Sequence, residues 1–245
     1  MKIAVAQIKP VKGDIASNIN DHIKLIDLAV ANSAGAIFFP ELSITGYEPE
    51  LAKELSTDKD DERFAIFQNI SDEKAITIGV GVPLKAVGGV QIGMLIFQPH
   101  RPVQVYSKQY LHADEVPYFV PGHEAVVLTL DNKKIAPAIC YELSVPEHPA
   151  AAHAAGANVY IASVAKTAAG MEKASETLAA IAEKYSMTVL IANAIGPCDN
   201  FLGTGKTSVW NNQGTLKAQL NDNSEGILIL DTATGQITES YCNII

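Results

Sequence analysis

The order of strand-like and helix-like segments is the feature that most restricts how this chain can fold. Residues 2–8, KIAVAQI, form a short apolar run that is typical of a strand. The next segment, SNINDHIKLIDLAVANSAG, has apolar residues at helical spacing, with Ser17 as the expected N-cap and Gly35 at the end. AIFF then predicts a second, buried strand. Strand, helix and strand in succession indicate the α/β class.

The rest of the chain reads mainly as strands. Helices are predicted at DERFAIFQNIS, VPEHPAAAHAAG and MEKASETLAAIAEKYS, whereas the pattern from Gly205 onward predicts strands alone. Roughly a dozen strands exceed one ordinary sheet, since sheets usually have about 4–6 strands. We therefore expect two packed sheets with helices outside them.

No sequence feature divides the chain into parts. It has no Pro/Ser/Gly linker, no low-complexity tract and no repeat of solenoid period. Hydrophobic residues make up 48% of the 245 residues and charged residues 18%, which suffices for a large core. We predict a single domain over residues 1–245.

Charge and cysteine content favour a soluble protein that binds a small molecule. Eighteen basic against 27 acidic side chains give a net charge of -9, and no basic run offers a surface for nucleic acid or an anionic membrane. Three cysteines, an odd number, do not form a disulfide framework. The sequence predicts neither a signal peptide nor a membrane span of about 18 apolar residues. We expect a cytoplasmic protein.

Three predicted strands end at reactive side chains. Glu41 comes just after AIFF, Lys108 follows PVQVYS, and Cys140 follows KIAPAI. In α/β folds, sites assemble at the ends of strands, because the sheet holds the loops there rigidly. Each residue alone is more often structural, but together they form a set for nucleophilic catalysis. A thiol with a free pKa near ~8.5 needs a base and a nearby cation to react at neutral pH.

The motifs around these residues resemble those of the nitrilase superfamily of carbon–nitrogen hydrolases. FFPEL, YSKQYL and ICYEL are similar to its three catalytic motifs, in the same chain order. EVPYFVPG, residues 115–122, is similar to the segment with the family's accessory glutamate, here Glu115, and IANAIG and GKTSVWNNQGTLKA resemble its later signatures. The resemblance covers essentially the whole chain.

This resemblance implies a fold, an assembly and a chemistry. The fold is a four-layer αββα sandwich with two central mixed β-sheets. Subunits would pair through helical faces into a homodimer or a higher homo-oligomer, with no metal and no organic cofactor. The implied substrate is a small-molecule amide or an N-carbamoyl compound.

The resemblance also implies roles for individual residues. Glu41 would act as the base and Cys140 as the nucleophile that forms a thioester. Lys108 and the backbone N–H of Tyr141 would hold the oxyanion. Glu115 would orient Lys108 or position the substrate and water.

Three further residues have weaker assignments. Glu142 matches an acidic position of the family's motif and is expected to give structural support, with an indirect role in the site as the alternative. Tyr47 is expected either to line the pocket or to pack in its loop. Lys166 is a candidate point charge at the pocket, although a loop lysine in solvent is the more common case.

The segment after the nucleophile departs from the family pattern. Family members commonly have Arg-Phe-Pro-Glu shortly after the cysteine, whereas this chain has SVPE at 144–147. Because the arginine is absent, bidentate recognition of a substrate carboxylate is less expected.

Several alternatives stay open at the level of the sequence. The same triad would serve an N-carbamoyl-amine hydrolase, a nitrilase or an enzyme that transfers the acyl group to a nucleophile other than water. A glutaminase that supplies a synthetase is disfavoured, because no second domain is predicted. From a different class, a catalytically silent ligand-binding protein would keep the fold. A Cys–His dyad with His112 or His123 is less expected, because neither histidine ends a strand.

Overall fold

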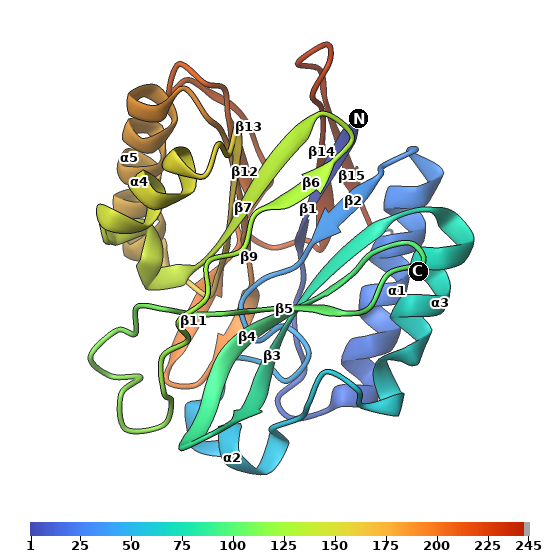
Figure 1. Ribbon diagram of the computed structural model, residues 1–245, viewed down its shortest axis with the longest axis vertical. Helices are drawn as coiled ribbons and strands as arrows, with labels where there is room; N and C mark the ends of the chain where they lie inside the picture. Colours follow the sequence, from blue (N-terminus) through green and yellow to red (C-terminus); the bar gives the residue numbers. More distant parts are fainter. Residues whose placement is uncertain (243–245) are drawn as a thin grey trace.

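Two mixed β-sheets pack face to face in the structure, a computed structural model that describes residues 1–242 (Figure 1). The first sheet has seven strands in the order β15-β14-β1-β2-β3-β4-β5, and the second has six in the order β13-β12-β9-β8-β7-β6. The strands of the first sheet are β1 (Lys2–Gln7), β2 (Ala36–Phe38), β3 (Thr77–Ala86), β4 (Gly89–Phe97), β5 (Gln104–Ser107), β14 (Gly226–Asp231) and β15 (Ile237–Tyr241). The strands of the second are β6 (Leu128–Leu130), β7 (Lys133–Ile139), β8 (Val159–Val164), β9 (Thr188–Asn193), β12 (Ser208–Trp210) and β13 (Leu216–Gln219).

Parallel pairing is confined to the middle of each sheet. In the first sheet β1, β2 and β3 are parallel neighbours, and in the second β7, β8 and β9 are. The outer pairs are antiparallel. A separate antiparallel hairpin, β10 (Ile195–Cys198) with β11 (Phe201–Thr204), follows β9.

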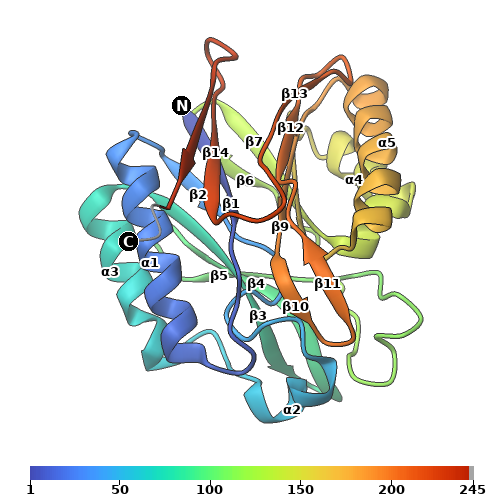
Figure 2. The same cartoon turned by 180° about the vertical axis from the view of Figure 1, so that it is seen from behind.

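Helices cover the outer faces of both sheets, as Figures 1 and 2 show. The helices α1 (Ile15–Ala31) and α3 (Ala65–Lys74) lie on the first sheet, and α4 (Glu147–Ala154) and α5 (Ala168–Tyr185) lie on the second. The short helices are η1 (Pro49–Leu51), α2 (Ala52–Leu55), η2 (Glu62–Phe64) and η3 (Cys140–Ser144). This arrangement confirms the predicted αββα sandwich with two central mixed sheets. None of the helices in residues 1–242 combines the length and the apolar composition needed to cross a bilayer.

The ends of α1 differ from the sequence prediction. The N-cap is Asp14, whose carboxylate accepts a hydrogen bond from the Ser17 N–H at 3.0 Å, so Ser17 lies inside the first turn. At the other end, the Asn32 side chain donates to the Leu28 carbonyl at 2.8 Å and closes the helix. The predictions of Ser17 and Gly35 as the two ends were therefore wrong. At each end, a side chain thus bonds to a backbone group of the terminal turn.

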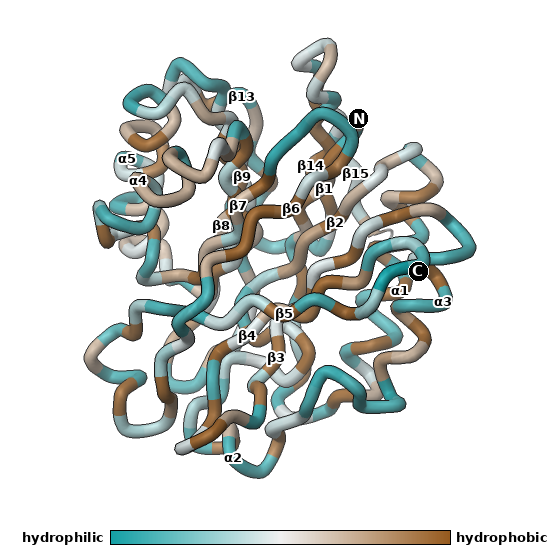
Figure 3. The backbone as a smooth tube through the Cα atoms, in the orientation of Figure 1, coloured by the Kyte–Doolittle hydropathy of each residue, from teal (hydrophilic) through white to brown (hydrophobic). Residues whose placement is uncertain are grey.

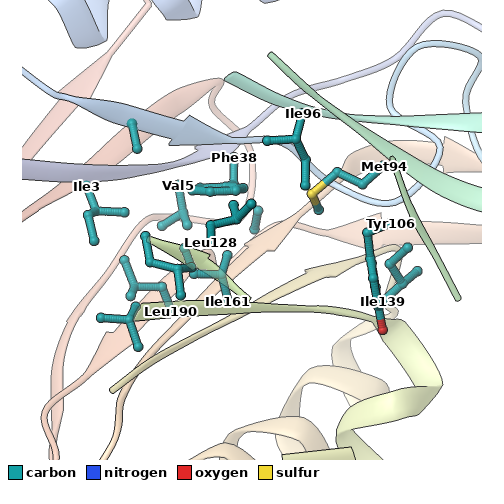
Figure 4. Close-up of a cluster of buried hydrophobic side chains, with 14 of the residues drawn as sticks. Ile3, Val5, Phe38, Met94, Ile96, Tyr106, Leu128, Ile139, Ile161 and Leu190 are labelled. Atoms are coloured by element: carbon teal, nitrogen blue, oxygen red, sulfur yellow. The ribbon is translucent and has the colours of Figure 1, made fainter. Parts of the chain in front are cut away.

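The core between the sheets consists of side chains from the facing strands. Figure 4 shows Val5, Phe38 and Ile96 from the first sheet opposite Ile161 and Leu190 from the second. Each of these side chains is fully buried. Two more clusters fill the space between each sheet and its helices. Figure 3 shows hydrophobic residues concentrated on the inner strands, while the turn between β6 and β7 is hydrophilic. Burial of apolar surface between these layers is what fixes the sandwich.

The connection between β5 and β6 links the two sheets near the site. Figures 1 and 2 show that it leaves the first sheet at the end of β5, loops out beside the β10–β11 hairpin and reaches the second sheet. The predicted strands before Glu41, Lys108 and Cys140 are all present, as β2, β5 and β7. The fold therefore has rigid supports directly before three of the predicted site residues.

Candidate active site

Glu41 lies in a buried turn that is hydrogen-bonded to β3. The turn follows β2, and the Ile44 N–H donates to the Gly81 carbonyl at 3.0 Å. A Cβ atom at Gly81 would overlap the backbone of Pro40 and Leu42. Glycine is therefore required where the two backbones approach each other. This close contact between β3 and the turn fixes the position of Glu41 relative to the sheet.

A buried histidine of α1 supports the same turn from the other side. The His22 Nε2 atom lies 2.9 Å from the Ser43 Oγ atom, and its Nδ1 atom lies 2.6 Å from the Asn18 carbonyl oxygen. Burial lowers the pKa of His22 to about 4, so the ring is neutral at neutral pH. The helix thereby anchors the turn without adding a charge near Glu41.

Lys108 joins two carboxylates in a continuous buried chain. Its Nζ atom lies 2.8 Å from Glu41 Oε1 and 2.6 Å from Glu115 Oε1. Glu115 also accepts hydrogen bonds from the Tyr47 hydroxyl at 3.1 Å and from the His112 backbone N–H at 2.7 Å. The side chains of Lys108, Glu41 and Glu115 are all almost completely buried. Such a chain is strong only while all its members are present, because each unpaired charge would be costly to bury.

Burial and the neighbouring charges make the Glu41 carboxylate a suitable proton acceptor. Burial alone would lower the pKa of Lys108, but the carboxylates outweigh it and raise the pKa, so the ammonium stays charged. For Glu41, burial raises the pKa, and the opposing effect of Lys108 is smaller. The second carboxylate oxygen, Oε2, is buried and has no hydrogen-bond partner within residues 1–242. A carboxylate with a raised pKa and a free oxygen is a better base than one in water.

Cys140 stands at a strained turn between β7 and η3. Its φ of 46° lies in the left-handed region, which costs a non-glycine residue about 1–2 kcal/mol. Glu142 stabilises the turn, because its carboxylate accepts from Ile139 N at 2.7 Å, Gln109 N at 2.5 Å and the Tyr106 hydroxyl at 2.6 Å. Gln109 directly follows Lys108. The carboxylate of Glu142 therefore ties the thiol-bearing turn to the strand end that carries the lysine.

The Cys140 thiol is protonated at neutral pH. Burial and the charge of Glu41 raise the pKa of the thiol to about 11, although Lys166 and Lys108 act in the opposite direction. The thiol lies close enough to Glu41 to lower the pKa of that carboxyl. A protonated thiol beside a free carboxylate oxygen favours proton transfer at the moment of attack over a thiolate formed in advance.

Cys140 opens onto a cavity of about 400 Å³. Its lining residues are Tyr47, His112, Asp114, Glu115, Cys140, Tyr141, Ala165, Lys166, Thr167, Gly170 and Phe201. The structure thus brings together five of the predicted site residues in one wall. Glu41 and Lys108 lie buried behind it, where Lys108 contacts both Glu41 and Glu115, and Glu142 is fully buried.

Several lining residues were not predicted from the sequence. Phe201 packs against Tyr47 with ring centroids 5.6 Å apart and comes from the β10–β11 hairpin, which was missed. The signal that could have found the hairpin is the Asp-Asn pair at 199–200 between IGPC and FLGT. His112 was expected only as an alternative base. It lines the cavity, but its Nδ1 atom is bonded to Asp114 Oδ1 at 2.6 Å and the side chain is 55% exposed.

A metal site is not built into this region. Within residues 1–242, no three His, Cys, Asp or Glu side chains are grouped so that they could hold a metal ion. The two carboxylates of the cavity wall instead bond to other side chains, Glu115 to Lys108 and Asp114 to His112. The site therefore offers a nucleophile, a base and hydrogen-bond donors, which together suit attack on a polarised carbon.

Fold and site together define a class of protein. An αββα sandwich with glutamate, lysine and cysteine at one cavity is the arrangement of a nitrilase-type enzyme that acts on carbon–nitrogen bonds. The carbon-nitrogen hydrolase family model matches residues 2–240, and the chain belongs to this family. The resemblance seen in the sequence is thereby confirmed: the chain is a member of the carbon–nitrogen hydrolase family.

Solved and curated relatives agree with this family. The NitN amidase of Nesterenkonia sp. AN1 superposes with a TM-score of 0.86 at 24% identity, over 94% of this chain and 92% of that one, and at this identity the likeness shows the fold. The glutamine-dependent NAD(+) synthetases of Thermotoga maritima and Acinetobacter baylyi are each 25% identical over 226 residues. These matches cover 88% and 89% of this chain but only 39% and 41% of the synthetases. The chain thus spans about two fifths of the length of these curated relatives.

Proposed function

We propose that this protein hydrolyses the C–N bond of a small-molecule amide through a thioester on Cys140. The observation that carries the proposal is the buried chain of Glu41, Lys108 and Glu115 beside a protonated thiol that opens onto a cavity. Family membership supports the same reaction class. Each step below follows from this arrangement.

In the first step the sulfur of Cys140 adds to the amide carbonyl carbon. Glu41 takes the thiol proton as the C–S bond forms, and the carbonyl π electrons move to the oxygen. Lys108 and the backbone N–H of Tyr141 then stabilise the oxyanion. Tyr141 is the second residue of η3, where backbone N–H groups have no partner within the helix.

In the second step the C–N bond breaks and the acyl group stays on sulfur. Glu41 delivers its proton to the leaving nitrogen, which departs as ammonia or an amine. A water molecule then adds to the thioester as Glu41 takes its proton. The C–S bond breaks, the proton returns to Cys140, and the carboxylic acid leaves. Glu115 keeps Lys108 aimed at the oxyanion and helps to position substrate and water.

The test is a substrate panel of aliphatic amides, N-carbamoyl amines and nitriles, assayed for ammonia together with intact-protein mass spectrometry. In two mutants of the Nesterenkonia amidase with a glutamate replaced, the acetamide moiety of fluoroacetamide is found covalently attached to the active-site cysteine, so fluoroacetamide is a suitable probe here. We expect turnover and the adduct in the wild type and in Cys198→Ala, and neither in Cys140→Ala. Unchanged turnover in Cys140→Ala would refute the mechanism.

The same panel separates the closest alternatives. An N-carbamoyl-amine hydrolase would release carbon dioxide together with ammonia, and a nitrilase would convert the nitriles. A silent binding protein would release no ammonia from any compound, and its Cys140 would label no faster than Cys198. The ammonia and carbon dioxide yields therefore assign one reaction.

A glutaminase is the second candidate function, and the curated relatives are the observation that favours it. Removing ammonia from glutamine is the same amide hydrolysis at the same site. In that role the ammonia would pass to a synthetase that lies outside the matched segment. Ammonia release from glutamine, at a rate above that from simple aliphatic amides, would support this assignment.

Cellular location and assembly stay predictions. We propose a cytoplasmic protein that forms a homodimer or a higher homo-oligomer through its helical faces. Light scattering coupled to gel filtration measures the assembly, and a monomer at micromolar concentration would contradict it.

A further inference from the structure

A buried histidine of α4 lies between tyrosines of both sheets. His148 is the second residue of α4, and each of its ring nitrogens faces a hydroxyl group. The Nε2 atom lies 2.8 Å from the Tyr106 hydroxyl of β5, and the Nδ1 atom lies 2.8 Å from the Tyr160 hydroxyl of β8. In Figure 4 the hydroxyl oxygen of Tyr106 points toward the helical segment that follows Ile139. His148 therefore connects a helix of the outer layer with one strand of each sheet.

The hydrogen bonds of this group run in one direction. The Tyr106 hydroxyl donates its single proton to Glu142 Oε2 at 2.6 Å, so its oxygen is left to accept from His148. The Nε2 atom of His148 therefore carries the ring proton, and its Nδ1 atom accepts from the Tyr160 hydroxyl. Burial lowers the pKa of His148 to about 4, which agrees with a neutral ring that donates at one nitrogen. The hydrogen-bond chain thus runs from Tyr160 through His148 and Tyr106 to Glu142.

Glu142 is the point where this chain meets the active site. Its carboxylate also accepts from the backbone N–H groups of Ile139 and Gln109. Ile139 directly precedes the nucleophile, and Gln109 directly follows the buried lysine of the charge chain. Glu142 keeps these two segments together only while its carboxylate has one orientation, and the Tyr106 hydroxyl is a side-chain donor that fixes it. Any group that holds the Tyr106 hydroxyl in place therefore helps to hold the nucleophile beside the lysine.

Aromatic packing holds the His148 ring itself. Tyr106, Tyr110 and Tyr160 surround it, with ring centroids 6.4, 6.3 and 5.7 Å from that of the imidazole. Tyr106 and Tyr160 are almost completely buried, and His148 is 7% exposed. A ring of similar size without nitrogens would keep this packing but leave the buried hydroxyl groups without their partners, which is unfavourable. Packing and hydrogen bonding by His148 can therefore be tested separately.

We propose that His148 is a positioning residue of the active site, because it holds the Tyr106 hydroxyl against Glu142. Through Glu142 it keeps the Cys140 turn aligned with the end of β5, which Lys108 follows. This assignment rests on the proposed function and extends it to a residue outside the cavity, which touches neither the substrate nor the reacting atoms. The helix α4 thereby acts on the site from the outer layer of the sandwich.

Steady-state kinetics on the best amide of the substrate panel test this role first. His148→Phe keeps an aromatic ring without either nitrogen and should lower kcat by about tenfold with KM within about threefold, because the chain is lost while the substrate cavity is intact. His148→Gln keeps an N–H donor for Tyr106 and should retain at least about a third of kcat. His153→Phe changes an exposed histidine of the same helix and should leave kcat unchanged.

A double-mutant cycle shows whether His148 acts through Tyr106. Tyr106→Phe removes the donor to Glu142 and should lower kcat at least as much as His148→Phe does. If His148 acts by holding that hydroxyl, adding His148→Phe to Tyr106→Phe should lower kcat by less than about twofold further. Two losses that simply multiply would overturn the proposal, because His148 would then support the protein independently of Tyr106.

Two NMR measurements report on the chain without any turnover. In His148→Phe the backbone amides of Ile139 and Gln109 should exchange with solvent at least about tenfold faster than in the wild type, whereas His153→Phe should leave both rates unchanged. In the wild type, ¹⁵N spectra of the histidine rings should show the proton of His148 on Nε2. A proton on Nδ1 would overturn the proposal, because the Tyr106 hydroxyl would then donate to His148 and not to Glu142.

Turnover and amide exchange together separate this proposal from the proposed function. If the wild type hydrolyses no amide, but His148→Phe accelerates exchange at Ile139 and Gln109, the proposed function fails and the positioning of the turn by His148 stands. If the wild type hydrolyses amides and His148→Phe leaves either kcat or the exchange rates unchanged, the His148 assignment fails and the amidase reaction stands. A lower kcat together with faster exchange in His148→Phe supports both.

Discussion

Replacing Lys108 by methionine tests the buried charge chain most directly. The change removes the cation that lies between Glu41 and Glu115, at 2.8 Å and 2.6 Å, and leaves two carboxylates in a site without solvent. Breaking a buried pair by removing one partner costs about 3–5 kcal/mol, because the remaining charge is uncompensated. For a chain of this size, 1 kcal/mol shifts the unfolding midpoint by about 2–4 °C, so we expect a fall of about 6–20 °C.

A second substitution should recover part of this loss. Glu41→Gln in the Lys108→Met background removes one of the two uncompensated charges, while Glu115 keeps its hydrogen bonds from Tyr47 and His112. We expect the double variant to regain about 1–3 kcal/mol relative to Lys108→Met, whereas Glu41→Gln alone should not stabilise the protein to that degree. The four proteins form a double-mutant cycle that is measured by urea unfolding at one pH.

The dependence on pH gives a second readout. Burial raises the pKa of Glu41 in the folded protein above its unfolded value, so this group's contribution to stability is complete below the unfolded pKa and is lost as the pH rises through the folded pKa. Without Lys108 the pKa of Glu41 rises further, because the lysine charge that lowers it is gone. The loss of unfolding free energy in Lys108→Met, relative to the wild type, should therefore be smaller at about pH 5 than at about pH 8. An equal deficit at both pH values, or a double variant no more stable than Lys108→Met, would refute the buried charge chain.

Three further predictions concern the residues around the nucleophile. Because the pKa of Cys140 is raised to about 11, iodoacetamide alkylation in the free enzyme should accelerate close to tenfold per pH unit from about pH 7 to pH 10, and a plateau below about pH 9 would contradict a protonated thiol. Glu142→Gln leaves fewer acceptor positions for three buried donors, so kcat should fall at least about tenfold with KM within about threefold, and steady-state kinetics that show an unchanged kcat would exclude this support. Gly81→Ala forces a methyl group against the Glu41 turn and should lower kcat about a hundredfold in the same assay, whereas wild-type activity would show that the turn tolerates displacement.

The sequence predicted the three strands that support the site well, because each strand is recognised from a short run of neighbouring residues. A run of apolar residues followed by Glu41, Lys108 or Cys140 predicts a strand and the residue at its end, and the structure places these residues directly or closely after β2, β5 and β7. The ends of α1 were predicted less well. Asp14 and Ser17 are both residue types that suit an N-cap, and the structure places Asp14 at that position.

The contacts between these supports could not be read from the sequence. Tyr47 and Glu115 are 68 residues apart, and their hydrogen bond exists because the β5–β6 connection crosses from one sheet to the other. Phe201 reaches Tyr47 from a hairpin that is too short for a clear alternating pattern. Such contacts depend on how whole elements pack, and a local pattern carries no information on that packing.

What the sequence determined by itself is the class of fold and the set of reactive groups, because hydrophobic periodicity and side-chain chemistry are properties of short segments. Only the tertiary structure decided the pKa values of those groups and which of them form ion pairs. The raised pKa values of Glu41 and Cys140 come mainly from burial, and Lys108 keeps its charge because Glu41 and Glu115 lie beside it. Burial and pairing are sums over neighbours from both sheets, so they exist only once the two sheets have packed together.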